Sequence, residues 1–221
     1  MTVDPPAARV SPWWLGGPVL LFGGNFLAAL STNTDQSNLV YQLSAVVATA
    51  LADLILIAYA LLAVRLSHLD EHETLALRRV PLRPAVRLAA GAFVAITVLD
   101  LVTDPLLHAG RKQGIAPTHS PNGEHQWIAL AAAVVGLVVV APLAEEITFR
   151  GLCFATMGRY AVPGSAALFA LAHGLPVLLA PIFVAGLVLG WLRARTGSLY
   201  PGLAVHMLLN ATALAAALAT A

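Results

Sequence analysis

Two adjacent glutamates and an arginine interrupt a strongly apolar part of the sequence, in PLAEEITFRGL at residues 142–152. On an α-helix Glu146 and Arg150 share one face, and glutamate four residues before arginine is the favourable order for an ion pair. Glu145 points about 100° away from Glu146, which leaves it unpaired and freer to face a cavity. The spacing predicts that Arg150 orients Glu146 while Glu145 acts as a general base on water. The alternative is a structural salt bridge that holds helices together.

Two histidines and an asparagine further along the chain add polar groups to apolar helices. His173 follows Phe169 by four residues in SAALFALAHGL, and HMLLN places His206 and Asn210 at the same spacing. Each pair alone also fits a packing hydrogen bond between helices. Together with the two carboxylates they suit hydrolysis, because a carboxylate can deprotonate water while a histidine or asparagine stabilises the oxyanion. Two histidines and a carboxylate also match a catalytic zinc set, so metal-bound and metal-free mechanisms both stay open.

The composition indicates the class of protein that must position these groups. The chain has 221 residues, of which 59% are hydrophobic and 10% charged, against roughly 25% charged in soluble domains. We therefore predict an all-α polytopic integral membrane protein, with residues 1–221 forming one transmembrane domain. The net charge of +1 gives no sign of nucleic-acid binding. The single cysteine, Cys153, excludes an intramolecular disulfide and a cysteine-based zinc site.

Seven apolar stretches are predicted to cross the membrane: residues 13–30, 39–65, 85–107, 126–160, 165–179, 180–194 and 199–220. A helix over the fourth stretch would be about 52 Å long, well beyond a ~30 Å hydrocarbon core. The first possibility is one long helix that carries the EExxxR motif and bends at Pro142. The second is two helices that meet at Pro142, which would raise the total from seven helices to eight. Seven spans with the N-terminus inside place Arg159, Arg193 and Arg195 on the cytoplasmic side, as the positive-inside rule favours.

The glutamates and the two histidines are predicted to lie at similar depths in the membrane. Under the seven-span topology, His173 and His206 each lie about eight residues, or roughly 12 Å, from the cytoplasmic end of their helix. Glu145 lies somewhat deeper, and the bend at Pro142 reduces the difference. Three separate helices then bring costly polar groups to similar depths in the inner half of the membrane, which favours a shared site over separate packing contacts.

Three short motifs together resemble those of a known family. EEITFR resembles the EExxxR motif, FALAH the FxxxH motif and HMLLN the HxxxN-type motif of the CAAX protease and bacteriocin-processing (CPBP, or Abi) family of intramembrane proteases. The resemblance covers about residues 126–215, and it implies a membrane-embedded endopeptidase with an all-helical fold and a cavity open towards the cytoplasm.

The resemblance also implies a role for each matching residue. Glu145 would activate water, with Glu146 and Arg150 as its supporting pair. Phe169 would form the substrate-binding wall beside His173. The remaining catalytic side chains would complete the site by metal ligation or oxyanion stabilisation: His173, His206 and Asn210.

The resemblance extends to cofactor and partners. The implied metal is Zn²⁺ or another divalent ion held by Glu145, His173 and His206, and the alternative is a glutamate-dependent protease that needs no tightly bound metal. The implied partners are a membrane-associated protein or peptide substrate and membrane lipids, with no nucleic acid. Arginine outnumbers lysine eleven to one, a bias of high-GC bacterial genomes, so we expect the bacterial cytoplasmic membrane. No feature of the sequence indicates an oligomeric state.

Two other classes of function remain compatible with the sequence. A non-catalytic membrane protein, such as an immunity factor or a scaffold for a partner helix, needs no hydrolytic site. A proton-coupled permease would use a carboxylate within the membrane as a proton relay, and Asp53 is a candidate unless it pairs with the glutamate and histidine helices. Asp100, Asp104 and His108 share a face near the outer end of their helix, where water can solvate them.

Overall fold

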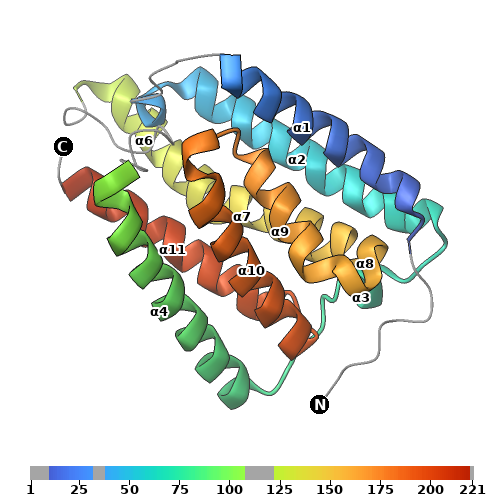
Figure 1. Ribbon diagram of the computed structural model, residues 1–221. Helices are drawn as coiled ribbons and strands as arrows, with labels where there is room; N and C mark the ends of the chain where they lie inside the picture. The colour runs from blue at the N-terminus through green and yellow to red at the C-terminus, as the bar shows by residue number, and fades with distance from the viewer. Residues whose placement is uncertain (1–9, 32–37, 108–121, 220–221) are drawn as a thin grey trace.

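The computed structural model describes residues 10–31, 38–107 and 122–219, and within these ranges it is helical and contains no strand (Figure 1). The longer helices pack side by side as a bundle. The α-helices in chain order are α1 (Gly16–Ser31), α2 (Leu43–Leu66), α3 (Glu71–Thr74), α4 (Leu82–Leu107), α6 (Glu124–Val135), α7 (Ala141–Glu145), α8 (Phe154–Met157), α9 (Ala161–Ala172), α10 (Leu179–Thr196) and α11 (Tyr200–Ala219). Short 3₁₀ turns are Pro12–Leu15, Leu39–Tyr41, Gly158–Tyr160 and Pro176–Leu178.

Five helical segments of the described chain are long and apolar enough to cross a membrane: α2, α4, Glu124–Ala172, Pro176–Thr196 and α11. Large apolar side chains such as Leu20, Leu101 and Leu106 are exposed on the outer faces, as expected of helices that contact lipid. α1 has 16 residues and a length of about 24 Å, short of the ~30 Å hydrocarbon core. The prediction of an all-α polytopic membrane protein is confirmed, while the count of seven or eight spans stays a prediction.

The long segment that carries the two glutamates changes its helical pattern on both sides of α7. A π-helical stretch, η3 (Gly136–Val140), separates α6 from α7, and a second, η4 (Glu146–Cys153), follows α7. Pro142 has no backbone N–H, so a regular hydrogen-bond ladder cannot continue through it, and the wider π turn directly precedes it. The sequence predicts a single bend at Pro142, whereas the structure distributes the irregularity over η3 and η4.

Gly158 ends this long segment and starts the return of the chain. Its φ of 55° lies in the left-handed region that favours glycine. A straight helix from Glu124 to Ala172 would be about 74 Å long, but α9 instead turns back and packs against η4 and α10 (Figure 1). The predicted stretch 165–179 is therefore wrong at both ends, because α9 begins at Ala161 and ends at Ala172.

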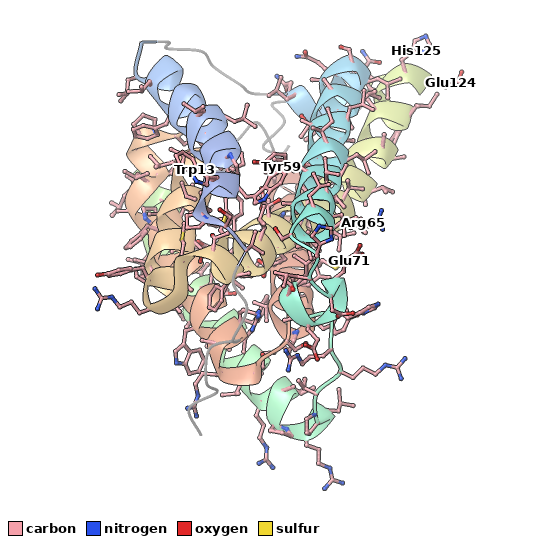
Figure 2. All side chains as sticks on the ribbon, turned by 90° about the vertical axis from the view of Figure 1, so that its right-hand side faces the viewer. Trp13, Tyr59, Arg65, Glu71, Glu124 and His125 are labelled. Atoms are coloured by element: carbon pink, nitrogen blue, oxygen red, sulfur yellow. The ribbon has the colours of Figure 1, made fainter. Side chains whose placement is uncertain are left out.

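One end of the bundle gathers the N-terminal part of the described chain and the loop between α2 and α4. Val10 packs into the same buried cluster as Leu75, the residue that follows α3. Arg65 pairs with Glu71 towards this end, whereas Glu124 lies at the opposite end (Figure 2). The N-terminal part of the described chain thus lies beside the loop between α2 and α4, which carries Arg78 and Arg79, as expected if both face the cytoplasm. The side of the membrane itself stays a prediction.

Candidate active site

The second π-helical stretch, η4, is buried along its whole length and packs against α2 and α9. The Glu146 and Arg150 side chains are both completely shielded, and Arg150 Nη1 lies 3.1 Å from Glu146 Oε1. The predicted ion pair is confirmed. Two further contacts hold the guanidinium: Nη2 donates to the Gly186 carbonyl at 3.4 Å, and Cζ lies 4.2 Å from the centre of the Phe169 ring.

His206 lies between the two glutamates. Its Nδ1 makes a 3.2 Å hydrogen bond with Glu146 Oε1, and its Nε2 lies 3.3 Å from Glu145 Oε2. The prediction that Glu145 is unpaired is therefore wrong, because α11 brings one histidine to both acids. The Glu145 side chain is nevertheless 22% exposed, whereas Glu146 is fully buried. Glu145 is thus the carboxylate of the pair that water can reach.

The two contacts of His206 differ in kind. A carboxylate oxygen only accepts hydrogen bonds, so the hydrogen bond with Glu146 needs a proton between His206 Nδ1 and Glu146 Oε1. The other ring nitrogen, Nε2, lies within ion-pair distance of Glu145 Oε2 and pairs with it when His206 is protonated.

Phe169 on α9 connects the aromatic members of the site. Its ring centre lies 4.7 Å from that of His173 and 5.7 Å from that of His206, both in T-shaped geometry. Since Arg150 lies over the face of the same ring, one buried phenylalanine touches three predicted site residues. Its predicted position beside His173 is confirmed, and its contact with substrate stays a prediction.

His173 is fixed by its own helix. Its Nδ1 lies 2.8 Å from the Phe169 carbonyl oxygen, and because a carbonyl only accepts, Nδ1 carries the proton. The nitrogen left for chemistry is Nε2. The Phe169 ring lies between His173 and the other two residues, Arg150 and His206. His206 therefore contacts the glutamates directly, as predicted, whereas His173 is connected to them through Phe169.

The predicted metal ligands are Glu145, His173 and His206, of which the first and last touch each other. Across the described ranges, no three His, Cys, Asp or Glu side chains are grouped so that they could hold an ion. As arranged, these donors do not fit a metal, and we derive no step through one. The metal-bound and the metal-free mechanism both stay predictions.

Asn210 contacts the backbone of the long segment. Its Nδ2 donates to the Leu137 carbonyl in η3 at 2.8 Å. Asn210 lies four residues after His206 on α11, so the two share a helix face, as predicted. The contact makes Asn210 a link between α11 and the long segment, while a role on the oxyanion stays a prediction.

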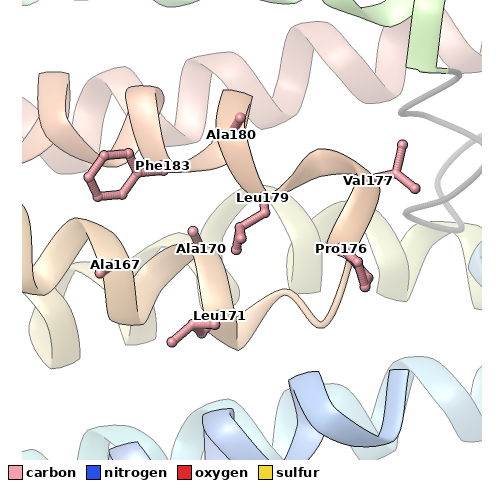
Figure 3. A pocket seen from close by; sticks show the side chains of 8 residues that line it. All are labelled: Ala167, Ala170, Leu171, Pro176, Val177, Leu179, Ala180 and Phe183. Carbon is pink, nitrogen blue, oxygen red and sulfur yellow. The ribbon is translucent and has the colours of Figure 1, made fainter. Parts of the chain in front are cut away.

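An apolar pocket of about 440 Å³ lies between α9 and the beginning of α10 (Figure 3). Its walls include Ala167, Leu171, Pro176 and Phe183. None of the predicted catalytic residues lines it. The pocket is therefore separate from the arrangement of glutamates and His206.

The motif-bearing part of the chain matches a known family. Residues 127–212 match the family model described as type II CAAX prenyl endopeptidase Rce1-like. This segment belongs to the CAAX protease family. The match includes Glu145, Arg150, His173 and Asn210, and it leaves α1, α2 and α4 outside. Neither the curated proteins nor the solved structures gave a match.

Sequence reasoning did not assign a third acid to the candidate site. Asp53 on α2 is 8% exposed, and its Oδ2 is buried without a hydrogen-bond partner among the described residues. Its helix α2 packs against α7, which ends at Glu145. The pairing of Asp53 with a polar group on the glutamate or histidine helices stays a prediction. His108, predicted to share a face with Asp100 and Asp104, lies outside the described residues.

Two more residues support the candidate site from neighbouring helices. Arg193 on α10 donates through Nε to the Arg150 carbonyl at 3.2 Å. Gly202 lies one turn before His206 on α11, and a Cβ there would lie 3.0 Å from Glu146 Oε2. In the sequence, Gly202 is marked only by its position four residues before His206. That spacing predicts that Gly202 also faces Glu146, but only once the contact between His206 and Glu146 is known.

Replacing Gly202 with alanine is expected to lower endopeptidase activity about ten- to hundredfold and stability by about 1–3 kcal/mol. Glu146 is held by Arg150 and His206, so it cannot yield to the new methyl group without disturbing the site. The matched control is Gly91→Ala on α4, where a Cβ meets nothing within 4 Å. Cleavage assays and thermal unfolding should separate the two variants, and equal behaviour would contradict the close approach.

Proposed function

We propose that this protein is an intramembrane endopeptidase that hydrolyses a peptide bond of a membrane-associated protein or peptide, with Glu145 activating the water. The observation that carries the proposal is His206 held between a partly exposed and a fully buried glutamate. A structural salt bridge needs only Glu146 and Arg150. The additional histidine and accessible carboxylate supply a place to hold and move a proton within the bilayer.

The proposed reaction begins when Glu145 accepts a proton from water. The water oxygen bonds to the scissile carbonyl carbon, and the carbonyl oxygen becomes an oxyanion. The C–N bond then breaks as the amine nitrogen takes up the proton from Glu145, which restores the carboxylate. His206 Nε2 holds the reacting carboxyl in place throughout, because it lies 3.3 Å from Glu145 Oε2.

The other residues have supporting roles in this proposal. Arg150 neutralises Glu146, so that the buried acid can fix the other side of His206. His173 Nε2, when protonated, donates to the oxyanion, since Nδ1 is already committed to Phe169. The Phe169 ring keeps both imidazoles in position and forms the wall beside them.

The setting proposed for this activity is the bacterial cytoplasmic membrane, with the N-terminus inside and membrane lipids around the helices. Five spans and an apolar outer surface support a substrate that enters from the membrane. A non-catalytic scaffold or immunity protein would share these features but would cleave nothing.

The test is cleavage of membrane-tethered peptides by the purified protein in lipid. The wild type, Glu145→Ala and His206→Ala are compared with Glu124→Ala, which changes an acid at the far end of the bundle (Figure 2). We expect both site variants to lose cleavage and the control to keep it. Cleavage that persists in Glu145→Ala would overturn the mechanism.

Metal removal provides a separate prediction. Because the three predicted ligands are not grouped as a set, we expect dialysis against a chelator to leave the cleavage rate within about twofold of its starting value. The rate is measured before dialysis, after it, and after adding back Zn²⁺. If dialysis abolished cleavage and added Zn²⁺ restored it, the metal-free mechanism would be replaced by a metal-dependent one. Its ligands would then be Glu145, His173 and His206.

A further inference from the structure

The hydrogen bond from Asn210 Nδ2 to the Leu137 carbonyl connects α11 to η3 across 73 residues of sequence. A backbone carbonyl inside a helix normally receives its own helix's N–H, so the acceptance of a side chain here needs an explanation.

Pro142 supplies that explanation. In an α-helix the Leu137 carbonyl would receive the N–H of Ala141, but Ala141 donates to Gly136 in the π pattern of η3. In the π pattern the donor to Leu137 would be residue 142, which is proline and has no N–H. Both helical donors are therefore lost. In a membrane an unsatisfied carbonyl is costly, and Asn210 provides the missing donor.

This bond also sets how α11 faces the carboxylates. Along α11, three positions each meet the long segment: Gly202 faces Glu146 Oε2, His206 faces both glutamates, and Asn210 holds Leu137. The three positions are four residues apart and therefore share one face. A slip of α11 by one residue would rotate this face by about 100° and remove His206 from between the acids.

We propose that Asn210 is a positioning residue: by completing the hydrogen bonding that Pro142 leaves open at Leu137, it holds α11 in the register that places His206 between Glu145 and Glu146. This role differs from contact with the oxyanion. It rests on the proposed function only for its activity readout, because the contact itself is independent of what the site does.

A double-mutant cycle with Asn210→Leu and Pro142→Ala tests the proposal. Alanine at 142 restores a backbone N–H that can donate to Leu137, so the effect of losing Asn210 should shrink. In the proline background we expect Asn210→Leu to lower kcat about 10- to 100-fold with KM within about twofold, since His206 is misplaced. In the Pro142→Ala background the same change should cost at least about fivefold less.

Thermal unfolding of the same four proteins gives a readout that needs no substrate. We expect Asn210→Leu to lower Tm by several degrees with Pro142 present and by clearly less with alanine. The control is Thr212→Val, which removes a side-chain hydrogen bond to Leu209 within α11 and should show no coupling to residue 142.

The outcomes separate the hypotheses. Equal losses of kcat in both backgrounds would mean that Asn210 acts on the reacting groups, and would overturn the positioning role. Additive Tm changes would overturn the hydrogen-bond pairing itself. Coupled Tm changes in a protein that cleaves no peptide would retain the Asn210–Leu137 contact and reject the proposed endopeptidase function.

Discussion

Replacing Glu145 with glutamine is expected to reduce peptide cleavage about 10²- to 10⁴-fold while the protein stays folded. Glutamine keeps the size of the side chain but cannot accept a proton from water. Glu145 is the partly exposed member of the pair at 22%, so the amide stays solvated and leaves no buried charge without a partner. The measurement is kcat for a membrane-tethered peptide, with thermal unfolding as the check on folding.

Glu146→Gln is the matched comparison for this prediction. Glu146 is fully buried and holds both Arg150 and His206, so its replacement should lower Tm as well as kcat. Glu145→Gln should lower kcat with little change in Tm. If Glu145→Gln retained cleavage while Glu146→Gln abolished it without unfolding, the roles assigned to the two acids would be reversed.

Replacing Arg150 with methionine is expected to destabilise the protein by about 3–5 kcal/mol. Methionine fills much of the same volume but leaves the Glu146 charge buried with its cation removed. The guanidinium contacts to the Gly186 carbonyl and the Phe169 ring are lost as well. Unfolding in detergent, followed by heat or denaturant, measures the change.

A second substitution distinguishes loss of charge balance from loss of packing. Arg150→Met combined with Glu146→Gln removes both charges and should recover most of the lost stability, although not the activity. Arg159→Met, at an exposed arginine, should change stability by less than about 0.5 kcal/mol. A double variant as unstable as Arg150→Met would show that the guanidinium acts through shape rather than charge.

The ion pair was predictable because it depends on local spacing. Glu146 and Arg150 are four residues apart, close enough to meet in the π-helical stretch η4 as they would in an α-helix. The orientation of Glu145 was less predictable, because its partner His206 lies on α11, 61 positions further along. An angle around one helix cannot show what a second helix brings to it.

The errors in the fold have local physical causes. The predicted junction of the fourth and fifth stretches, between residues 160 and 165, lies close to the turn Gly158–Tyr160, where Gly158 has a positive φ. The fifth stretch was extended too far, to residue 179, because apolar residues continue past the end of α9 at Ala172 through Leu175 and Val177. The π-helical pattern beside Pro142 was not predicted because proline signals a break without showing how the helix accommodates it. The partner of Asn210 is a backbone carbonyl, which carries no side-chain signal in the sequence.

The π-helical stretches η3 and η4 change how many residues separate the polar groups of the long segment. Each π turn holds one residue more than the α turn it replaces, so η3 takes up an extra residue without turning Glu145 away from its direction relative to α6. Removing a residue between Leu137 and Pro142 would return that turn to an α pattern and place the proline four residues after Leu137. The Leu137 carbonyl would then still lack a helical donor, so a shortened segment would depend on Asn210 as much as the natural one does.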